Sequence, residues 1–224
     1  MVILDFYGLP GSGKSEISHA LAEKLRYSGY SVKEPSWILD MRYGTLKRLA
    51  VKLYKAISYS TGHLKQLRRI LALSNIPKRN LSQSLKMWVN LAYTLNYENS
   101  NNVDFLIMDE GIAQAVISLY TEAKAENYKI CYNYIRNLVN NSVIPVYVNV
   151  KTDVALARLS KRKNGKSRLD ELDGSKRMEM TERINSICSH LDYEAFVVKN
   201  DKEVDDAVDK ISDYLQRNEE SWLR

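Results

Sequence analysis

Residues 8–15 read GLPGSGKS, which places three glycines, one lysine and two serines within eight positions. Before them, residues 2–7 (VILDFY) form a short apolar run that is typical of a buried strand. After them, Ile17, Leu21 and Leu25 recur every four residues, as expected for one face of a helix. A strand, a glycine-rich loop and a helix, in this order, are the context in which the pattern G-x-x-x-x-G-K-S binds phosphate.

The residue types of this loop suit a nucleoside triphosphate. Glycines allow the backbone N–H groups to turn inward toward phosphate oxygens, and the following helix directs its positive end to the same place. Lys14 is expected on the β- and γ-phosphates, and the Ser15 hydroxyl on Mg²⁺. The alternative is a glycine-rich turn without a ligand. The residues expected to bind the nucleotide here are Gly8, Pro10, Gly11, Ser12, Gly13, Lys14 and Ser15.

The composition describes an ordinary globular chain. Its 224 residues, 45% hydrophobic and 27% charged, suffice for a single α/β domain with a helical insertion. No apolar run is long enough to span a bilayer, and no signal peptide is recognisable, so we expect a cytoplasmic protein without a membrane partner. Cys131 and Cys188 have no metal-ligand spacing and are expected to be buried, reduced thiols.

The net charge of +6 is unevenly distributed. Residues 33–100 hold twelve Lys and Arg against three acids, which gives +9 and leaves −3 for the rest of the chain. This excess indicates an anionic partner, and a nucleic acid is one candidate that the sequence does not favour, because no aromatic-plus-basic RNA signature is present. The alternative is a set of solvated helix faces.

Apolar residues recur with a helical period in three stretches of residues 34–100, and strands alternate with helices in the rest of the chain. The helical stripes predict packing surfaces, and they could supply a homodimer interface. The alternation predicts a parallel sheet covered by helices on both faces, with ligands bound beyond the carboxyl ends of its strands. One stripe consists of Leu46, Leu49, Ala50, Leu53, Tyr54 and Ile57, and the next, after a break predicted at Thr61-Gly62, of Leu64, Leu67, Ile70 and Leu71.

A second group of polar residues follows the apolar run 103–108. Asp109 is expected to hold Mg²⁺ through water or to accept the proton of an acceptor hydroxyl, and Glu110 is the alternative acceptor contact. Alternatively, one of these acids caps the next helix. Asp40 and Arg42 could also face the acceptor, although Asp40 could equally cap a helix. Which of Asp40, Asp109 and Glu110 acts as base stays open.

Residues 161–174 form a basic, glycine-containing stretch between a predicted helix at 153–162 and another predicted around 178–191. Arg158, Arg162 and Arg168 could close over a transferring phosphoryl group as a lid, exclude water and neutralise its charge. The alternative is that basic residues at a helix end complement the helix dipole.

The chain resembles small P-loop kinases of the thymidylate kinase-like group of nucleoside and nucleotide kinases. The likeness covers about residues 1–29 and 105–215 and rests on four pieces: GLPGSGKS, the apolar run into Asp109, VYVNVKTDVALARLSKRKNGKSRLD at 146–170 and VVKNDKEVDDAVDKI at 197–211. It implies a three-layer P-loop NTPase fold with a five-stranded parallel sheet of order 2-3-1-4-5. It also implies Mg-ATP as phosphate donor, a helical acceptor-binding insertion at 34–100, and adenine beside Asn200 and Asp201.

Two departures concern the acceptor. Glu110 occupies the position at which thymidylate kinases have an arginine, and Glu34-Pro35-Ser36 stands where they have Glu-Pro-Gly. We therefore predict an ATP-dependent phosphotransferase that acts on a nucleotide or nucleoside-like acceptor, small and either anionic or hydroxyl-bearing. The alternatives are a kinase of a sugar, a metabolite or a nucleic-acid end, and a non-catalytic ATP-dependent binding module or switch.

Overall fold

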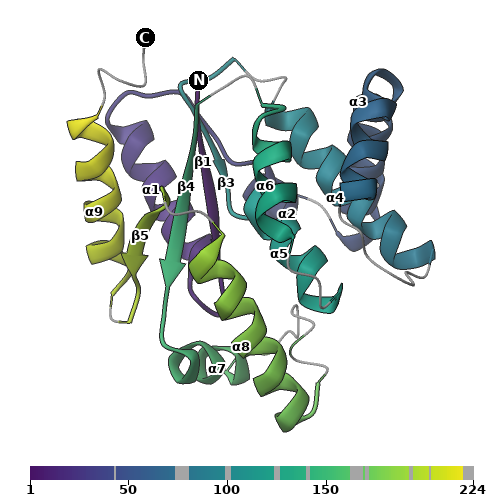
Figure 1. The fold of residues 1–224 in the computed structure, drawn as a ribbon. Coiled ribbons are helices and arrows are strands. Elements are labelled where there is room, and N and C mark those ends of the chain that lie inside the picture. Colours follow the sequence, from purple (N-terminus) through teal and green to yellow (C-terminus); the bar gives the residue numbers. More distant parts are fainter. Residues whose placement is uncertain are drawn as a thin grey trace.

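The computed structural model contains one five-stranded sheet and the helices that cover it (Figure 1). The described residues are 1–42, 44–73, 81–98, 102–123, 127–139, 142–161, 169, 172–191, 194–201 and 203–218. The strands are β1 (Val2–Gly8), β2 (Val32–Lys33), β3 (Phe105–Met108), β4 (Ser142–Asn149) and β5 (Phe196–Lys199). The helices are α1 (Lys14–Tyr27), α2 (Pro35–Arg42), α3 (Thr45–Leu73), α4 (Leu81–Glu98), α5 (Ile112–Ala123), α6 (Tyr128–Arg136), α7 (Thr152–Ser160), α8 (Gly174–His190) and α9 (Val204–Arg217).

All strand pairs are parallel, and the strand order is β2-β3-β1-β4-β5, as predicted. β1 is central, and each of its residues is buried, which explains the continuous apolar run in the sequence. In its register Asp5 lies beside Met108 of β3 and Pro145 of β4. The strands therefore end at a common edge, where the loop after β1 and the acids after β3 are brought together.

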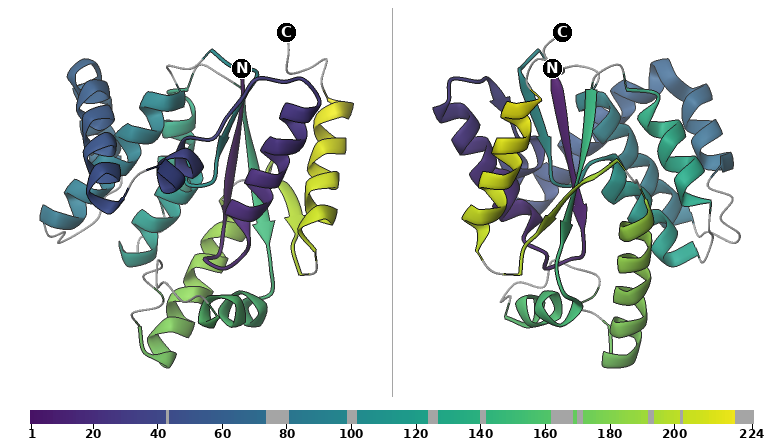
Figure 2. Two further views of the ribbon diagram at one scale, coloured as in Figure 1. Left: turned by 180° about the vertical axis from the view of Figure 1, so that it is seen from behind. Right: turned by 60° about the vertical axis from the view of Figure 1, so that its left-hand side comes forward.

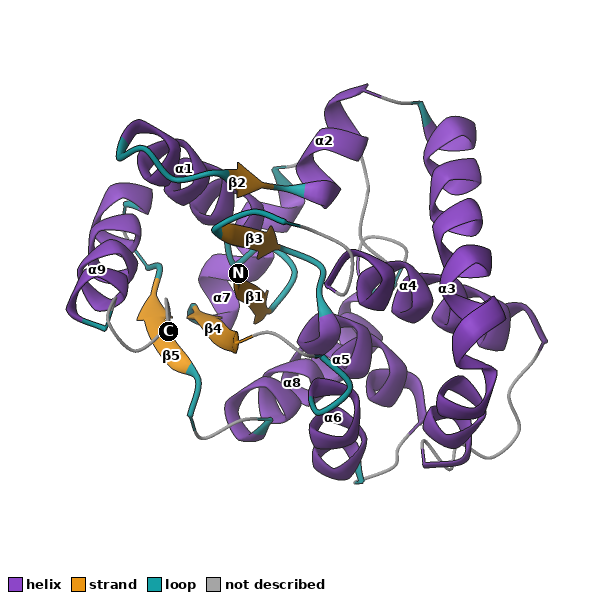
Figure 3. Ribbon diagram, turned by 90° about the horizontal axis from the view of Figure 1, so that it is seen from above, coloured by secondary structure: helices purple, strands orange, loops and turns teal. Residues whose placement is uncertain are grey.

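Helices cover both faces of the sheet (Figures 1 and 3). One apolar cluster joins α1 and α9 to one face, through residues such as Leu4, Ile17 and Ile211. The other face packs against α5, α6 and α8 in a cluster that includes Tyr7, Tyr120 and Ile187. This is the three-layer α/β arrangement that the sequence predicted.

Between β2 and β3 the chain forms α2, α3 and α4, which extend to one side of the three layers (Figure 3). The sequence predicted a break at Thr61-Gly62, but α3 continues through these residues and is kinked at His63, whose backbone angles are not helical. The side chains of Thr61 and His63 lie within hydrogen-bonding distance of the Ser58 and Tyr59 carbonyl oxygens, at 2.9 and 2.8 Å. Such local bonds compete with the helical hydrogen bonds and bend a helix.

The apolar stripe of α3 corrects a prediction. It was expected to be a packing surface, yet Leu46 is 84% exposed and Tyr54 is 71% exposed. The buried residues in this half of α3 are Ala56 and Tyr59, whereas Leu67 and Ile70 of the second predicted stripe are buried as expected. Periodicity identified the helix but did not identify which of its apolar positions face the core. Leu49 and Ile57 of this stripe are also exposed, as is Leu64 of the second stripe.

Two local boundaries differ from the prediction. α8 begins at Gly174, a turn earlier than expected, because the Asp173 carboxylate accepts a 3.0 Å hydrogen bond from the Lys176 amide and caps the helix. α7 ends at Ser160, two residues before the predicted end. Within the described ranges, no helix combines the length and the apolar character needed to cross a bilayer.

Candidate functional site

The glycine-rich loop joins β1 to α1 at the carboxyl-terminal edge of the sheet, as expected. The Lys14 ammonium lies over the loop and donates hydrogen bonds of 3.0 Å to the carbonyl oxygens of Gly8 and Leu9. A further bond of 3.0 Å, from the Ser12 amide to the Leu9 carbonyl, closes the turn. The loop is thus folded around its own lysine at the N-terminus of a helix, which is the arrangement that favours an anion.

At two positions of the loop, neighbouring atoms leave no room for any residue larger than glycine. Gly11 has φ of 84°, and a Cβ atom there would lie 2.5 Å from the Ala155 carbonyl oxygen of α7. Gly13 has φ of 86°, and its Cβ atom would collide with the Asn200 side-chain amide. Both backbone conformations are unfavourable for other residues. Figure 2 shows α7 across this end of the sheet, opposite to the N-terminus. The loop is therefore in direct contact with α7 and with the residue that follows β5.

Asn200 and Asp201 were predicted to lie beside adenine. In the structure Asn200 is buried, and its side-chain amide donates a 2.6 Å hydrogen bond to the Ser12 carbonyl oxygen. Asp201 is exposed and accepts a 3.1 Å hydrogen bond from the backbone amide of Lys151, which is the N-cap of α7. Asn200 is therefore bonded to the glycine-rich loop, and Asp201 to the residue at which α7 begins.

Asp109 and Glu110 directly follow β3. Asp109 is half-buried and Glu110 is exposed, and the α5 N-terminus is capped by a different acid. That acid is Asp5 of β1, whose carboxylate accepts a 2.9 Å hydrogen bond from the Ala113 amide. Gly111 makes this approach possible, because a Cβ atom there would collide with Asp5 Oδ1. Asp5, and not Asp109 or Glu110, thus accepts this hydrogen bond at the start of α5.

A cluster of lysines and tyrosines lies next to these acids. Lys52 Nζ of α3 is 3.7 Å from Glu110 Oε2 and 5.5 Å from the Tyr93 ring centroid. Burial, then the neighbouring Tyr97, Glu110 and Asp109, raise the pKa of the Tyr93 hydroxyl far above its usual value. Two more ammonium groups, from Lys33 and Lys55, lie 5.6 and 4.9 Å from the centroid of the Tyr97 ring. We call Lys33, Lys52, Lys55, Tyr93 and Tyr97 the Lys–Tyr cluster.

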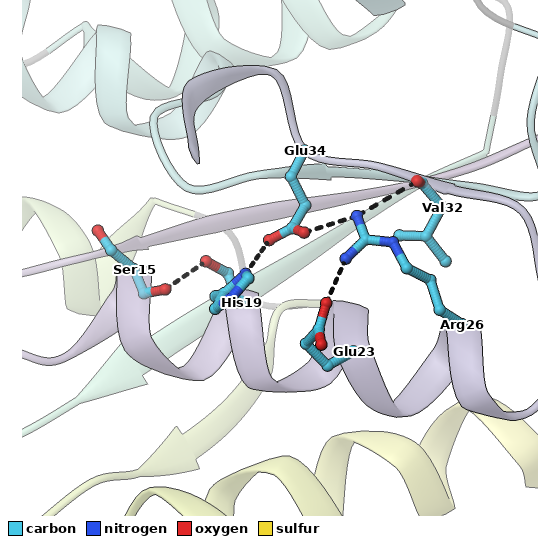
Figure 4. A network of polar contacts seen from close by, with 7 residues as sticks. Ser15, His19, Glu23, Arg26, Val32 and Glu34 are labelled. Atoms are coloured by element: carbon cyan, nitrogen blue, oxygen red, sulfur yellow. Dashed lines mark hydrogen bonds and ion pairs between the residues drawn. The ribbon is translucent and has the colours of Figure 1, made fainter. Parts of the chain in front are cut away.

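Glu34 connects the end of β2 to α1 (Figure 4). Its carboxylate accepts a 2.7 Å hydrogen bond from Arg26 and lies 3.1 Å from His19 Nδ1. The ring of Trp37 in α2 stacks on His19 at a centroid distance of 3.8 Å. This network joins α1 to the residue that follows β2 and to α2.

The remaining predicted residues are only partly described. Arg158 is half-buried in the last turn of α7, and Arg42 is exposed at the end of α2. Arg162 and Arg168 of the predicted lid lie outside the described residues, as does the side chain of Asp40. Leu172, near the end of the predicted lid, accepts a 3.0 Å hydrogen bond from Arg177 of α8.

Comparison with solved structures shows what this architecture is similar to. The chain matches deoxyadenosine kinase from M. mycoides with a TM-score of 0.51 and 18% identity, over 97% of this chain and 99% of that one. It matches shikimate kinase from Bacteroides thetaiotaomicron with a TM-score of 0.55 and 13% identity, over 96% and 98%. The fold is that of the P-loop kinases.

A third structure with the P-loop kinase fold is the YorR protein of Bacillus subtilis, solved in complex with phosphorylated GDP. It has a TM-score of 0.54 and 13% identity, over 99% of this chain and 98% of that one. No protein-family model and no curated protein sequence matches the chain. At such identities the likeness establishes the fold.

The donor groups expected to hold Mg²⁺ are one hydroxyl and one carboxylate. Ser15 and Asp109 follow the ends of the adjacent strands β1 and β3. Across the described part of the chain, no three His, Cys, Asp or Glu side chains form a metal cluster. Mg²⁺ commonly binds through one or two carboxylates together with substrate phosphates and water. Ser15 and Asp109 therefore fit an ion that arrives with a nucleotide.

Several residues of this site were not identified from the sequence as functional. Asp5 had one visible signal, because it is a single acid inside an apolar strand. The Lys–Tyr cluster had only a weak signal, the basic excess of residues 33–100, which did not distinguish three lysines from the rest. Buried Glu98 at the end of α4 had none, and its pKa is raised well above 4.5 by burial and then by Asp5.

Proposed function

We propose that this protein is an ATP-dependent phosphotransferase that moves the γ-phosphate of Mg-ATP to a nucleotide or nucleoside-like acceptor. The observation that carries the proposal is the loop at residues 8–15, folded around the Lys14 ammonium at the N-terminus of α1. Backbone amides and a lysine in this arrangement bind the triphosphate and stabilise the charge that develops during transfer. The P-loop kinase fold supports the same conclusion.

The roles of the individual residues follow from their positions. Lys14 contacts the β- and γ-phosphates, while Ser15 and Asp109 hold Mg²⁺, which neutralises phosphate charge when it is bound. Asp109 can alternatively take the proton of an acceptor hydroxyl. Arg158 and the arginines of the proposed lid at residues 161–174 cover the transferring group, and adenine lies near the turn after β5. The lid residues in this assignment are Arg162 and Arg168.

The acceptor is proposed to lie between Asp109 and the helices of the insertion at residues 34–100. Glu110, Asp40 and Arg42 are the acceptor contacts expected from the sequence. The Lys–Tyr cluster adds a reason to expect an anionic acceptor, because three ammonium groups lie on two tyrosine rings beside Glu110. Lysine ammonium groups bind phosphate, and tyrosine rings offer apolar surface to a base.

The test is a panel of acceptors incubated with Mg-ATP. Nucleosides, nucleoside monophosphates, sugars, shikimate-like metabolites and nucleic-acid ends are each assayed for transfer of labelled γ-phosphate. We expect transfer to a nucleoside or nucleotide by the wild type, and a loss of at least about a hundredfold in Lys14→Ala. Asp109→Asn in a folded protein tests the roles proposed for this residue, since near-normal transfer would exclude both base and metal functions.

The panel also distinguishes the alternatives. Transfer to a sugar, a metabolite or a nucleic-acid end would replace the proposed acceptor and retain the kinase. Slow hydrolysis of ATP without transfer to any acceptor would indicate a nucleotide-dependent binding module or switch. A steep fall of nucleic-acid binding with added salt would support a polyanionic partner for the basic insertion.

A further inference from the structure

Asn200 follows the last residue of β5 and is 1% exposed. Its backbone amide donates a 2.9 Å hydrogen bond to the Asn149 carbonyl at the end of β4, which fixes the main chain. Its side chain then reaches back across the sheet edge and donates a 2.6 Å hydrogen bond to the Ser12 carbonyl oxygen. Asn200 is therefore held in place by the sheet and is bonded to the phosphate loop from outside.

The bonded oxygen belongs to the peptide unit between Ser12 and Gly13. This peptide is trans, as are all those of the described residues, so its C=O and N–H bonds point in opposite directions. Holding the Ser12 carbonyl toward Asn200 consequently turns the Gly13 amide away from Asn200. Inward-pointing amides of this loop are the groups that bind phosphate oxygens.

Gly13 and Asn200 are also fitted to each other sterically. Gly13 has a positive φ of 86°, and any Cβ atom there would collide with Asn200 Nδ2. The contact is thus made possible by the absence of a side chain at position 13. Gly13, which the loop needs for its positive φ, therefore also leaves room for the Asn200 side chain that holds the Ser12–Gly13 peptide unit.

We propose that Asn200 is a positioning residue for the triphosphate: by holding the Ser12 carbonyl, it sets the direction of the Gly13 amide. This inference rests on the proposed function, in which the loop binds Mg-ATP. It differs from a contact between Asn200 and adenine, because an orienting role makes the same contribution whatever base the nucleotide carries. Base recognition at this turn would then depend on other groups.

The experiment compares three ligands that share a triphosphate. Binding of Mg-ATP, Mg-GTP and magnesium tripolyphosphate is measured by calorimetry for the wild type, Asn200→Ala and Asn200→Asp. The matched control is Asn218→Ala, which removes a 2.7 Å asparagine–carbonyl bond to Tyr214 at the end of α9, away from the loop. Thermal unfolding without ligand compares the folded stability of each variant.

We expect Asn200→Ala to weaken all three ligands by a common factor of about three to ten, the range for one hydrogen bond. Asn218→Ala should leave all three affinities unchanged. Asn200→Asp places a carboxylate against the Ser12 carbonyl and should weaken binding further at pH 7.5. At about pH 5 the protonated Asp can donate again, so its affinity relative to the wild type should recover.

Two results would overturn the proposal. A loss confined to ATP, with GTP and tripolyphosphate unaffected, would show that Asn200 reads the base. Unchanged affinities in both Asn200 variants would show that the Ser12 bond has no part in binding. If Asn200→Ala does not fold, the acid-dependent recovery of Asn200→Asp decides the question. Failure of the wild type to bind any of the three ligands would instead refute the proposed function, and this inference with it.

Discussion

The Asp5 carboxylate, in the middle of the central strand, accepts a hydrogen bond of 2.9 Å from the Ala113 amide at the start of α5. Asp5 thereby holds the turn formed by Asp109, Glu110 and Gly111, which connects β3 to this helix. A buried acid is usually costly, but here it satisfies a helix N-terminus that would otherwise lack an acceptor. Asp5 therefore links the stability of the sheet to the position of the proposed catalytic acid.

Replacement of Asp5 tests this link. Asp5→Ala leaves the buried Ala113 amide without its acceptor, and we expect a loss of about 1–3 kcal/mol in the free energy of unfolding. Asp5→Asn keeps an acceptor oxygen and should lose less. Urea unfolding monitored by circular dichroism measures both. Equal losses in the two variants would show that the cap contributes nothing.

Glu98 should make stability depend on pH. Burial and then Asp5 raise its pKa above the ordinary value of 4.5, so the folded state binds this proton more tightly than the unfolded state. Stability contributed by the protonated form is complete below pH 4.5 and is lost progressively as pH rises toward the folded pKa.

Glu98→Gln removes this dependence and keeps the shape of the side chain. We expect the variant to melt about 2–4 °C above the wild type at pH 8, equivalent to about 1 kcal/mol, with a smaller difference at pH 5. Glu179→Gln, at an exposed position of α8, is the control and should not change the pH profile. If the wild type is less stable than Glu98→Gln by the same amount at both pH values, protonation of Glu98 is excluded as the cause of the difference.

The Lys–Tyr cluster predicts a selective effect on the acceptor. Lys52→Ala and Lys55→Ala should each raise KM for a monophosphate acceptor roughly tenfold or more, as expected when a charge-assisted contact is lost. KM for ATP should change little. The control is Lys65→Ala, an exposed lysine on the same helix beyond the kink. Similar increases in KM for ATP and acceptor would indicate a general distortion of α3.

Both cysteines should be unreactive in the folded protein. Cys131 and Cys188 are both buried, and burial raises the pKa of the Cys188 thiol to about 12. Because the thiolate is the reactive form, we expect no reaction with an aromatic disulfide reagent at pH 8, and two reactive thiols in denaturant. Rapid labelling of either cysteine in native buffer would contradict this packing.

The exposed apolar residues of α3 predict a homodimer. Leu46, Leu49, Tyr54 and Ile57 lie on one side of a helix that carries seven Lys and Arg and no acid. Burying this face against a second copy would remove apolar surface from water but bring like charges together. We therefore expect a dimer by analytical ultracentrifugation that is favoured by salt, and a monomer for Leu49→Glu/Ile57→Glu. A monomeric wild type at high salt would refute the prediction.

Several features could be predicted from the sequence because their signals are local. The strand before residue 8, the loop glycines and the helix after Ser15 are adjacent in the chain, and the buried run 105–108 shows the continuous hydrophobicity of a central strand. The strand order 2-3-1-4-5 was implied by resemblance to a family and is confirmed. The packing face of the first half of α3 was predicted wrongly, since periodicity defines a stripe without showing what covers it.

Hydrophobic period and loop chemistry thus determined by themselves that strands and helices alternate and that a phosphate loop joins the first pair. Only the tertiary structure decided which polar groups serve that loop and its neighbours. Asn200 and Ser12 are separated by 188 positions in the chain, and Asp5 and Ala113 by 108. A hydrogen bond between such distant residues leaves no periodic or compositional pattern, because its geometry exists only after the parallel strands have brought their carboxyl ends to one edge.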